Sequence, residues 1–157
     1  LVVSTIIPSC PSYCPMLHKQ LQFLVYNKLK DATAFDDLLF ISHLVDTTGA
    51  IPDLKRFNSE QEGTYPENWK IVIGNDNPIY DFDLPNNKNI KHSPCSDSMS
   101  CVGGKAYYQM IMLIDRNRNV RGLYQGNQTP LVERLRGDIR KLFVEYVEED
   151  REKKAKK

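Results

Sequence analysis

The chain has 157 residues, with 21 basic and 20 acidic side chains and a formal net charge of +1. This length suits one domain, which would bury about two-thirds of the surface that its unfolded form exposes. The balanced charge does not favour nucleic acid or an anionic membrane surface as a partner, and the apolar runs are too short to span a bilayer. The four cysteines fit two pairs, which are common as disulfides in exported proteins and rare in a reducing cytosol.

The first apolar run and the turn after it hold the most informative residues. The β-branched segment 1–7 is typical of a strand buried on both faces. It leads into Cys10-Pro11-Ser12-Tyr13-Cys14-Pro15, and we expect an amphipathic helix from Met16. The N–H groups and partial positive charge of a helix N-terminus favour thiolate over thiol. On near-helical backbone, Cys10 and Cys14 would have Cα atoms roughly 6 Å apart, which allows a disulfide or two ligands to one soft metal ion.

The middle of the chain predicts two more strands and a long polar loop. Segment 38–42, running on towards Val45, has the pattern of a buried strand, so strand, helix and strand imply a right-handed parallel crossover. A short helix is expected at 52–57, and a strand at 69–74 ends at a glycine. The loop 84–104 shows no periodicity, and a loop of this length in a compact domain is usually functional or mobile.

The last third predicts a β-hairpin followed by a helix. Strands are expected at 107–114 and 120–124, with Asn119 suited to a left-handed conformation in the turn between them. Thr129 is expected to cap a helix that has Pro130 at its first position. The almost wholly charged segment 148–157 predicts a solvated or disordered tail.

This order of elements, with a dithiol after the first strand, predicts a thioredoxin-like α/β fold: a central mixed sheet flanked by helices, in a single domain over residues 1–147. Because the sequence opens directly in a strand without an initiator methionine, we expect that the N-terminal part of the parent protein is missing.

The dithiol turn resembles that of the Sco (SenC) family, copper-handling proteins in the assembly of respiratory cytochrome oxidase. Further segments are similar to the family in the same order, especially to Bacteroidetes-type members, and the resemblance covers most of residues 1–147. They are Phe40-Ile41-Ser42-His43, Asn68-Trp69-Lys70, Arg121-Gly122-Leu123-Tyr124-Gln125-Gly126 and Asp138-Ile139-Arg140-Lys141-Leu142.

The resemblance implies copper binding or redox chemistry at Cys10 and Cys14, in the periplasm or another extracytoplasmic location. It also implies a membrane anchor in the missing N-terminal part, which would be the chain's only contact with a membrane. The partner would be a protein, either a respiratory oxidase subunit or a client that carries a disulfide.

The chain departs from the family at the third copper ligand. The family's histidine falls at Tyr107, eight residues before Asp115, and a phenol is a poor ligand for Cu(I). His92, in the polar loop with Cys95 and Cys101, is an alternative donor. For this cysteine pair we favour a structural disulfide over a metal role, because closing such a short loop contributes roughly 2 kcal/mol.

The other two histidines receive structural interpretations. His18 shares a helix face with Cys14, but we interpret it as a polar residue that flanks the core stripe. We interpret His43, in the second strand, as a hydrogen-bonded core histidine.

Three functions stay open. One is Sco-like copper handling, with copper as the only metal implied. Another is a thiol–disulfide oxidoreductase in which Cys10 attacks a substrate disulfide and Cys14 resolves the mixed disulfide, which would make the chain an enzyme. The last is a degenerate, non-catalytic binding module with an inert disulfide.

Overall fold

The computed structural model describes residues 1–6, 13–45, 66–74 and 110–156. Its strands form one five-stranded sheet in the order β3-β2-β1-β4-β5. The strand bounds are β1 Val2–Ile6, β2 Phe40–Val45, β3 Trp69–Gly74, β4 Met110–Ile114 and β5 Val120–Gln125. Each of these strands falls within or beside a segment that the sequence predicts to be extended.

The sheet is mixed, as predicted. Strand β1 lies at its centre and pairs in parallel with β2, which pairs in parallel with β3. On its other side β1 pairs antiparallel with β4, and β4 forms the hairpin with β5. Both Val2 and Val3 are almost completely buried, which agrees with the prediction of a first strand buried on both faces.

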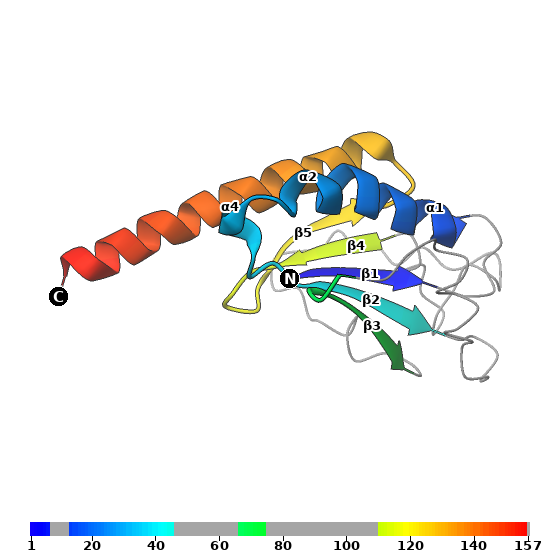
Figure 1. Ribbon diagram of the computed structural model, residues 1–157, viewed down its shortest axis with the longest axis horizontal. Helices are drawn as coiled ribbons and strands as arrows, with labels where there is room; N and C mark the ends of the chain where they lie inside the picture. The colour runs from blue at the N-terminus through cyan, green and yellow to red at the C-terminus, as the bar shows by residue number, and fades with distance from the viewer. Residues whose placement is uncertain (7–12, 46–65, 75–109, 157) are drawn as a thin grey trace, which may run out of the picture.

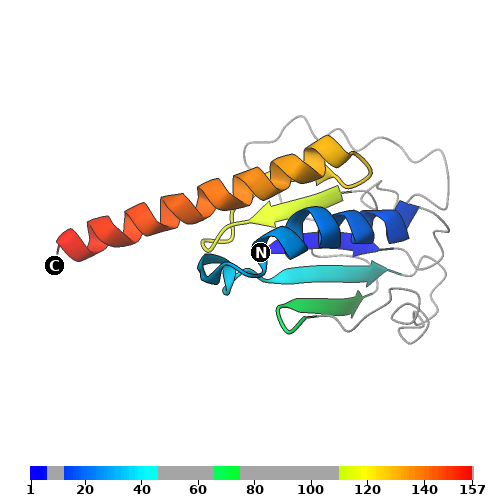
Figure 2. The ribbon, with the colours of Figure 1, turned by 45° about the horizontal axis from the view of Figure 1, so that its top comes forward.

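Two helical segments lie side by side in one layer that covers one face of the sheet (Figures 1 and 2). The first runs without a break through α1 Tyr13–Gln20, the π-helical segment η1 Leu21–Tyr26 and α2 Asn27–Leu29. A single turn of 3₁₀ helix, η2 Thr33–Phe35, then leads to β2. The second helical segment is α4 Thr129–Ala155, which extends well past the sheet (Figure 1).

The main core lies between the sheet and these helices. Its buried side chains are mostly aliphatic, with Phe40, Trp69 and Tyr124 as the aromatic members. The aliphatic members are Val2, Leu17, Leu21, Val25, Leu29, Leu38, Ile111, Leu113, Val132, Leu135, Ile139 and Leu142. A second cluster of Val3, Met112 and Ile114 is buried on the opposite face.

The π-helical segment has a specific partner in α4. A π turn hydrogen-bonds i to i+5 and so leaves the regular backbone ladder. Here the carbonyl oxygen of Leu24 accepts a hydrogen bond from the Arg136 guanidinium at 3.0 Å. This donor lies 112 positions further along the chain, so local periodicity could not have predicted the contact.

Two predicted details are wrong. The expected N-cap of the last helix is Thr129, but Gln128 holds that position and Thr129 is helical. In the hairpin turn Arg118, not Asn119, takes the positive φ of 68°. Asn119 instead donates its backbone N–H and side-chain amide to the carboxylate of Asp115.

The tail from residue 148 is solvated as predicted, but it is helical rather than disordered up to Ala155. Glu149 and Asp150 both pair with Arg116 of the hairpin turn. Glutamate, lysine and arginine are also good helix formers, so a charged sequence here continues the helix.

Candidate functional site at the edge where the parallel strands end

The edge of the sheet at which β1, β2 and β3 end is also the edge at which helix α1 begins. Parallel strands bring their carboxyl ends to the same edge, and α1 begins after β1 at this edge (Figure 1). Strand β4 runs antiparallel to β1 and therefore starts here, three residues after Tyr107. Ligand sites of open α/β sheets lie at this kind of edge.

The backbone of α1 places Cys14 in the first helical turn. The helix starts at Tyr13, before the predicted Met16, so Cys14 belongs to the helix itself. The first turn contains no acidic residue, so no carboxylate within that turn offsets the positive end of the helix dipole. This environment favours a thiolate.

One turn further along α1, His18 is a core residue. Its side chain is only 2% exposed, and its ring centroid lies 4.8 Å from that of Trp69 on β3. Burial lowers the pKa of His18 from 6.5 to about 4, so the imidazole is neutral at physiological pH. The interpretation of His18 as a flanking polar residue is therefore wrong.

Trp69 is held in place by polar and aromatic contacts. Its indole N–H donates to the Ser42 hydroxyl at 2.9 Å, and the hydroxyls of Ser42 and Ser4 lie 3.2 Å apart. Phe40 stacks on the indole at 5.0 Å between ring centroids. We call His18, Trp69, Ser42 and Ser4 the buried polar line, because it crosses from α1 to the three parallel strands without a charged group.

His43 lies on β2 next to Ser42, so its side chain points to the opposite face of the sheet. It is 3% exposed, and desolvation lowers its pKa. This agrees with a core histidine, away from the face that α1 covers.

Several predicted site residues lie outside the described part of the chain. They are Cys10, His92, Cys95, Cys101 and Tyr107. The redox pair, the second disulfide and the third-ligand alternatives therefore stay predictions. Among the described residues, no group of three or more His, Cys, Asp or Glu side chains could hold a metal ion.

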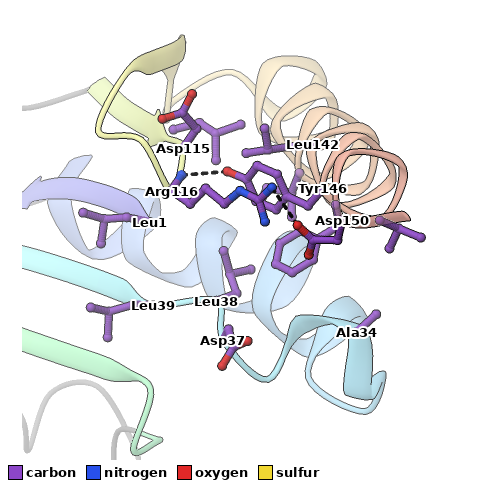
Figure 3. A pocket seen from close by; sticks show the side chains of 14 residues that line it. Leu1, Ala34, Asp37, Leu38, Leu39, Asp115, Arg116, Leu142, Tyr146 and Asp150 are labelled. Carbon is purple, nitrogen blue, oxygen red and sulfur yellow. Dashed lines mark hydrogen bonds and ion pairs between the residues drawn. The ribbon is translucent and has the colours of Figure 1, made fainter. Parts of the chain in front are cut away.

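A cavity of about 420 Å³ lies at the other end of the sheet, where Leu1 precedes strand β1 and Asp115 follows strand β4 (Figure 3). Its walls include Leu38, Leu142 and the ring of Tyr146. Arg116 at its rim donates its backbone N–H to the Tyr146 hydroxyl and pairs with Asp150. The cation at this cavity is thus already engaged in joining the hairpin to α4, and we assign the cavity no chemistry.

These features define a thioredoxin-like α/β fold with a cysteine at the first strand-to-helix junction. Among solved structures, the chain is similar to the crystal structure of a SCO1/SenC family lipoprotein from Bacillus anthracis, with a TM-score of 0.60 and 21% sequence identity. The match covers 90% of this chain and 79% of that one. The predicted fold class is therefore confirmed.

No protein-family model matches the sequence, and no curated protein sequence matches it. In the described ranges, no helix is both long and apolar enough to cross a membrane.

Proposed function

We propose that this chain is a Sco-like dithiol protein that works outside the cytoplasm in the assembly of a respiratory cytochrome oxidase. The observation that carries the proposal is the placement of Cys14 in the first turn of α1, beside the carboxyl end of the central strand β1. The likeness to a SCO1/SenC family lipoprotein over 90% of the chain supports it. That neighbour is a lipoprotein, which supports a membrane-anchored location for the full-length protein.

In this proposal the cargo is copper, held by Cys10 and Cys14. Two thiolates are soft donors and prefer Cu(I) to the divalent ions that oxygen ligands select. The positive end of α1 favours the thiolate form that metal binding needs. The donor chemistry of this turn therefore fits Cu(I), and the partner would be the oxidase subunit that receives it.

A second candidate is thiol–disulfide exchange without copper, and the tyrosine at position 107 favours it. In this reaction the Cys10 thiolate attacks a client disulfide and forms a mixed disulfide, releasing one client thiolate. The Cys14 thiolate then attacks the Cys10 sulfur and releases the second. The client gains two electrons, and the dithiol becomes a disulfide. Such a client could be the copper-site cysteines of the oxidase.

Copper stoichiometry of the anaerobically reduced protein tests the proposal. We expect wild type to bind equimolar Cu(I), and Cys10→Ser and Cys14→Ser to bind none. The control is the double variant Cys95→Ser with Cys101→Ser, which should bind as wild type does and melt at a slightly lower temperature, since we predict a structural disulfide there.

A parallel measurement separates the candidates. Titration of the Cys10–Cys14 pair against glutathione, read by alkylation and peptide mass, gives its reduction potential. Reversible cycling without Cu(I) binding would support the oxidoreductase. A pair that neither binds Cu(I) nor cycles would contradict both and leave an inert binding module.

A further inference from the structure

We propose that the projecting end of helix α4 is a contact surface for anionic lipid headgroups, which it meets with Arg151, Lys153, Lys154 and Lys156. We call residues 151–156 the basic tip. This inference rests on the membrane-anchored location in the proposed function. The resemblance predicts an N-terminal anchor as the only contact with a membrane, and the basic tip adds a second one.

The charges along the projecting part of α4 are separated by sign and by pairing. Its acidic residues nearest the sheet meet arginines of the hairpin: Glu149 and Asp150 pair with Arg116, and Glu145 pairs with Arg121. The basic tip contains four cations and one carboxylate, which gives it a formal charge of +3. Within the described part of the chain, none of these four cations forms an ion pair. The cations of the basic tip are therefore available to an anionic partner.

The basic tip lies at the same end of the domain as the start of the first strand. Leu1, Val147 and Asp150 line one cavity, so α4 passes the start of β1 just before the basic tip begins. Beyond Asp150 the helix rises by about 1.5 Å per residue and continues away from the sheet, as both ribbon views show (Figures 1 and 2). A membrane anchor upstream of Leu1 would attach the domain by the end from which the basic tip projects.

Projection also separates the basic tip from the carboxylates at this end of the domain. Asp37 lines the cavity, and Glu148 precedes the basic tip on the sheet side. From Asp150 to Ala155 the helix advances about 8 Å, which is about the Debye length at physiological ionic strength. The basic tip can thus meet a negative surface while these carboxylates stay about one screening length behind it.

The net charge of the whole chain hides this arrangement. A formal net charge of +1 predicts no attraction to an anionic membrane, because acidic and basic residues cancel over the whole surface. Screening prevents distant carboxylates from cancelling a local charge of +3 at a projecting end. Each basic side chain close to an anionic bilayer raises the affinity by about fivefold. Cations in the last turn also stabilise the helix through its dipole, so the contact with lipid needs a direct measurement.

Co-sedimentation with lipid vesicles tests the inference. At millimolar lipid, we expect the chain to bind vesicles of mixed phosphatidylglycerol and phosphatidylcholine, and not vesicles of phosphatidylcholine alone. Binding should disappear at about 1 M salt. Replacing the four cations of the basic tip with glutamine should lower the affinity for the mixed vesicles at least about 100-fold. Equal binding to both kinds of vesicle, or to neither, would overturn the inference.

A matched variant with the same change in net charge locates the contact. It replaces Lys19, Lys28, Arg134 and Arg140 with glutamine, and these four exposed residues belong to the helical layer over the sheet. This variant should bind the mixed vesicles nearly as well as wild type does. An equal loss in both quadruple variants would show that overall charge attracts the chain to lipid, which would overturn the assignment to the basic tip.

A second measurement needs no substitution. A small fraction of lipid that carries a gadolinium chelate broadens the amide NMR signals of the residues closest to the headgroups. We expect the strongest broadening in residues 151–156 and the weakest near Val45 and Gly74, where strands β2 and β3 end. The strongest broadening at those strand ends would contradict the proposed orientation and overturn the inference.

The outcomes separate this inference from the proposed copper function. The basic tip and the start of α1 lie at opposite ends of the domain (Figure 1), so replacing the four cations of the tip should leave the Cu(I) stoichiometry unchanged. A chain that binds Cu(I) but not the mixed vesicles would overturn the lipid contact and leave the copper function standing. A chain that binds the mixed vesicles through the basic tip but no Cu(I) would support the lipid contact and overturn the copper function.

Discussion

Two regions of the sheet differ in their polar side chains: one buries neutral groups, and the other exposes charged groups. The buried polar line of His18, Trp69, Ser42 and Ser4 is neutral and packed under α1. The hairpin end is charged and largely exposed, where Arg116 pairs with Glu149 and Asp150 and its guanidinium lies 4.4 Å from the centre of the Tyr146 ring.

The difference determines how each region contributes to the stability of the fold. Neutral groups in a low-dielectric core need no counter-charge, but protonating one of them is costly. Exposed ion pairs contribute little, because water and salt screen them. The buried polar line therefore makes the stability of the core sensitive to pH, whereas the ion pairs of Arg116 join the hairpin turn to α4 with little gain in stability.

The largest effect should come from acid. The pKa of His18 is about 4 in the folded protein against an ordinary 6.5, so the unfolded chain takes up the proton first. The contribution to stability is complete above about pH 6.5 and falls as the pH drops towards 4, by about 3 kcal/mol in total. Urea unfolding at pH 7 and pH 4.5 measures this fall.

Two variants sharpen the acid experiment. His18→Gln should reduce the difference between pH 7 and pH 4.5, whereas Lys19→Gln, an exposed neighbour on the same helix, should retain it. Part of the difference should remain in His18→Gln, because burial also lowers the pKa of His43. Desolvation raises the pKa of Asp115, but hydrogen bonds from Asn119 and Asn117 outweigh it and the net shift is downward. The contribution of Asp115 to stability is therefore lost at a lower pH than that of His18. If the free energy of unfolding fell equally between pH 7 and pH 4.5 in His18→Gln and in wild type, this account would be contradicted.

The next effect concerns two glycines in and beside the hairpin region. A Cβ at Gly122 would meet the Tyr124 hydroxyl and lie 2.7 Å from its Cζ. Tyr124 donates to Asp138 of α4 at 3.0 Å, so Gly122→Ala must displace this ring and weaken the contact. We expect a loss of about 1–3 kcal/mol in the free energy of unfolding.

Gly137 gives the control for the same substitution. A Cβ there would meet nothing within 4 Å, and the residue lies inside helix α4. Because alanine is the better helix former, Gly137→Ala should raise stability by about 0.5–1 kcal/mol. If both alanine variants changed the free energy of unfolding in the same direction, the close approach at Gly122 would not destabilise the alanine variant as expected.

The smallest effect should come from the exposed ion pairs. Arg116→Gln removes both pairs to α4, and we expect a slight fall in melting temperature that disappears at about 1 M salt. Arg140→Gln, an exposed site on the same helix, matches the change in charge. A fall that persists in salt would mean that this cluster stabilises the fold as the core does.

Sequence patterns predicted the strands because each has a continuous apolar or alternating run, as in segments 1–7 and 69–74. They also predicted the fold class and the position of Cys14 near a helix start. The burial of His18 was not predicted from the sequence. The apolar stripe through Leu17 and Leu21 does not show whether a residue beside it is buried, and the contact that decides this, with Trp69, comes from 51 positions away. The charged helix beyond residue 148 escaped for the same reason: its partner, Arg116, is on a distant hairpin.

The π turn between α1 and α2 has a consequence for comparing sequences. Leu17, Leu21, Val25 and Leu29 are all buried, yet a repeat of four residues advances about 40° per step around a helix of 3.6 residues per turn. The wider turn at η1 takes up part of this drift. In an ancestor without it, the same face would need one residue fewer. An alignment to such a relative must therefore open a one-residue gap within 21–26, or Cys14 and His18 will be matched to the wrong neighbours.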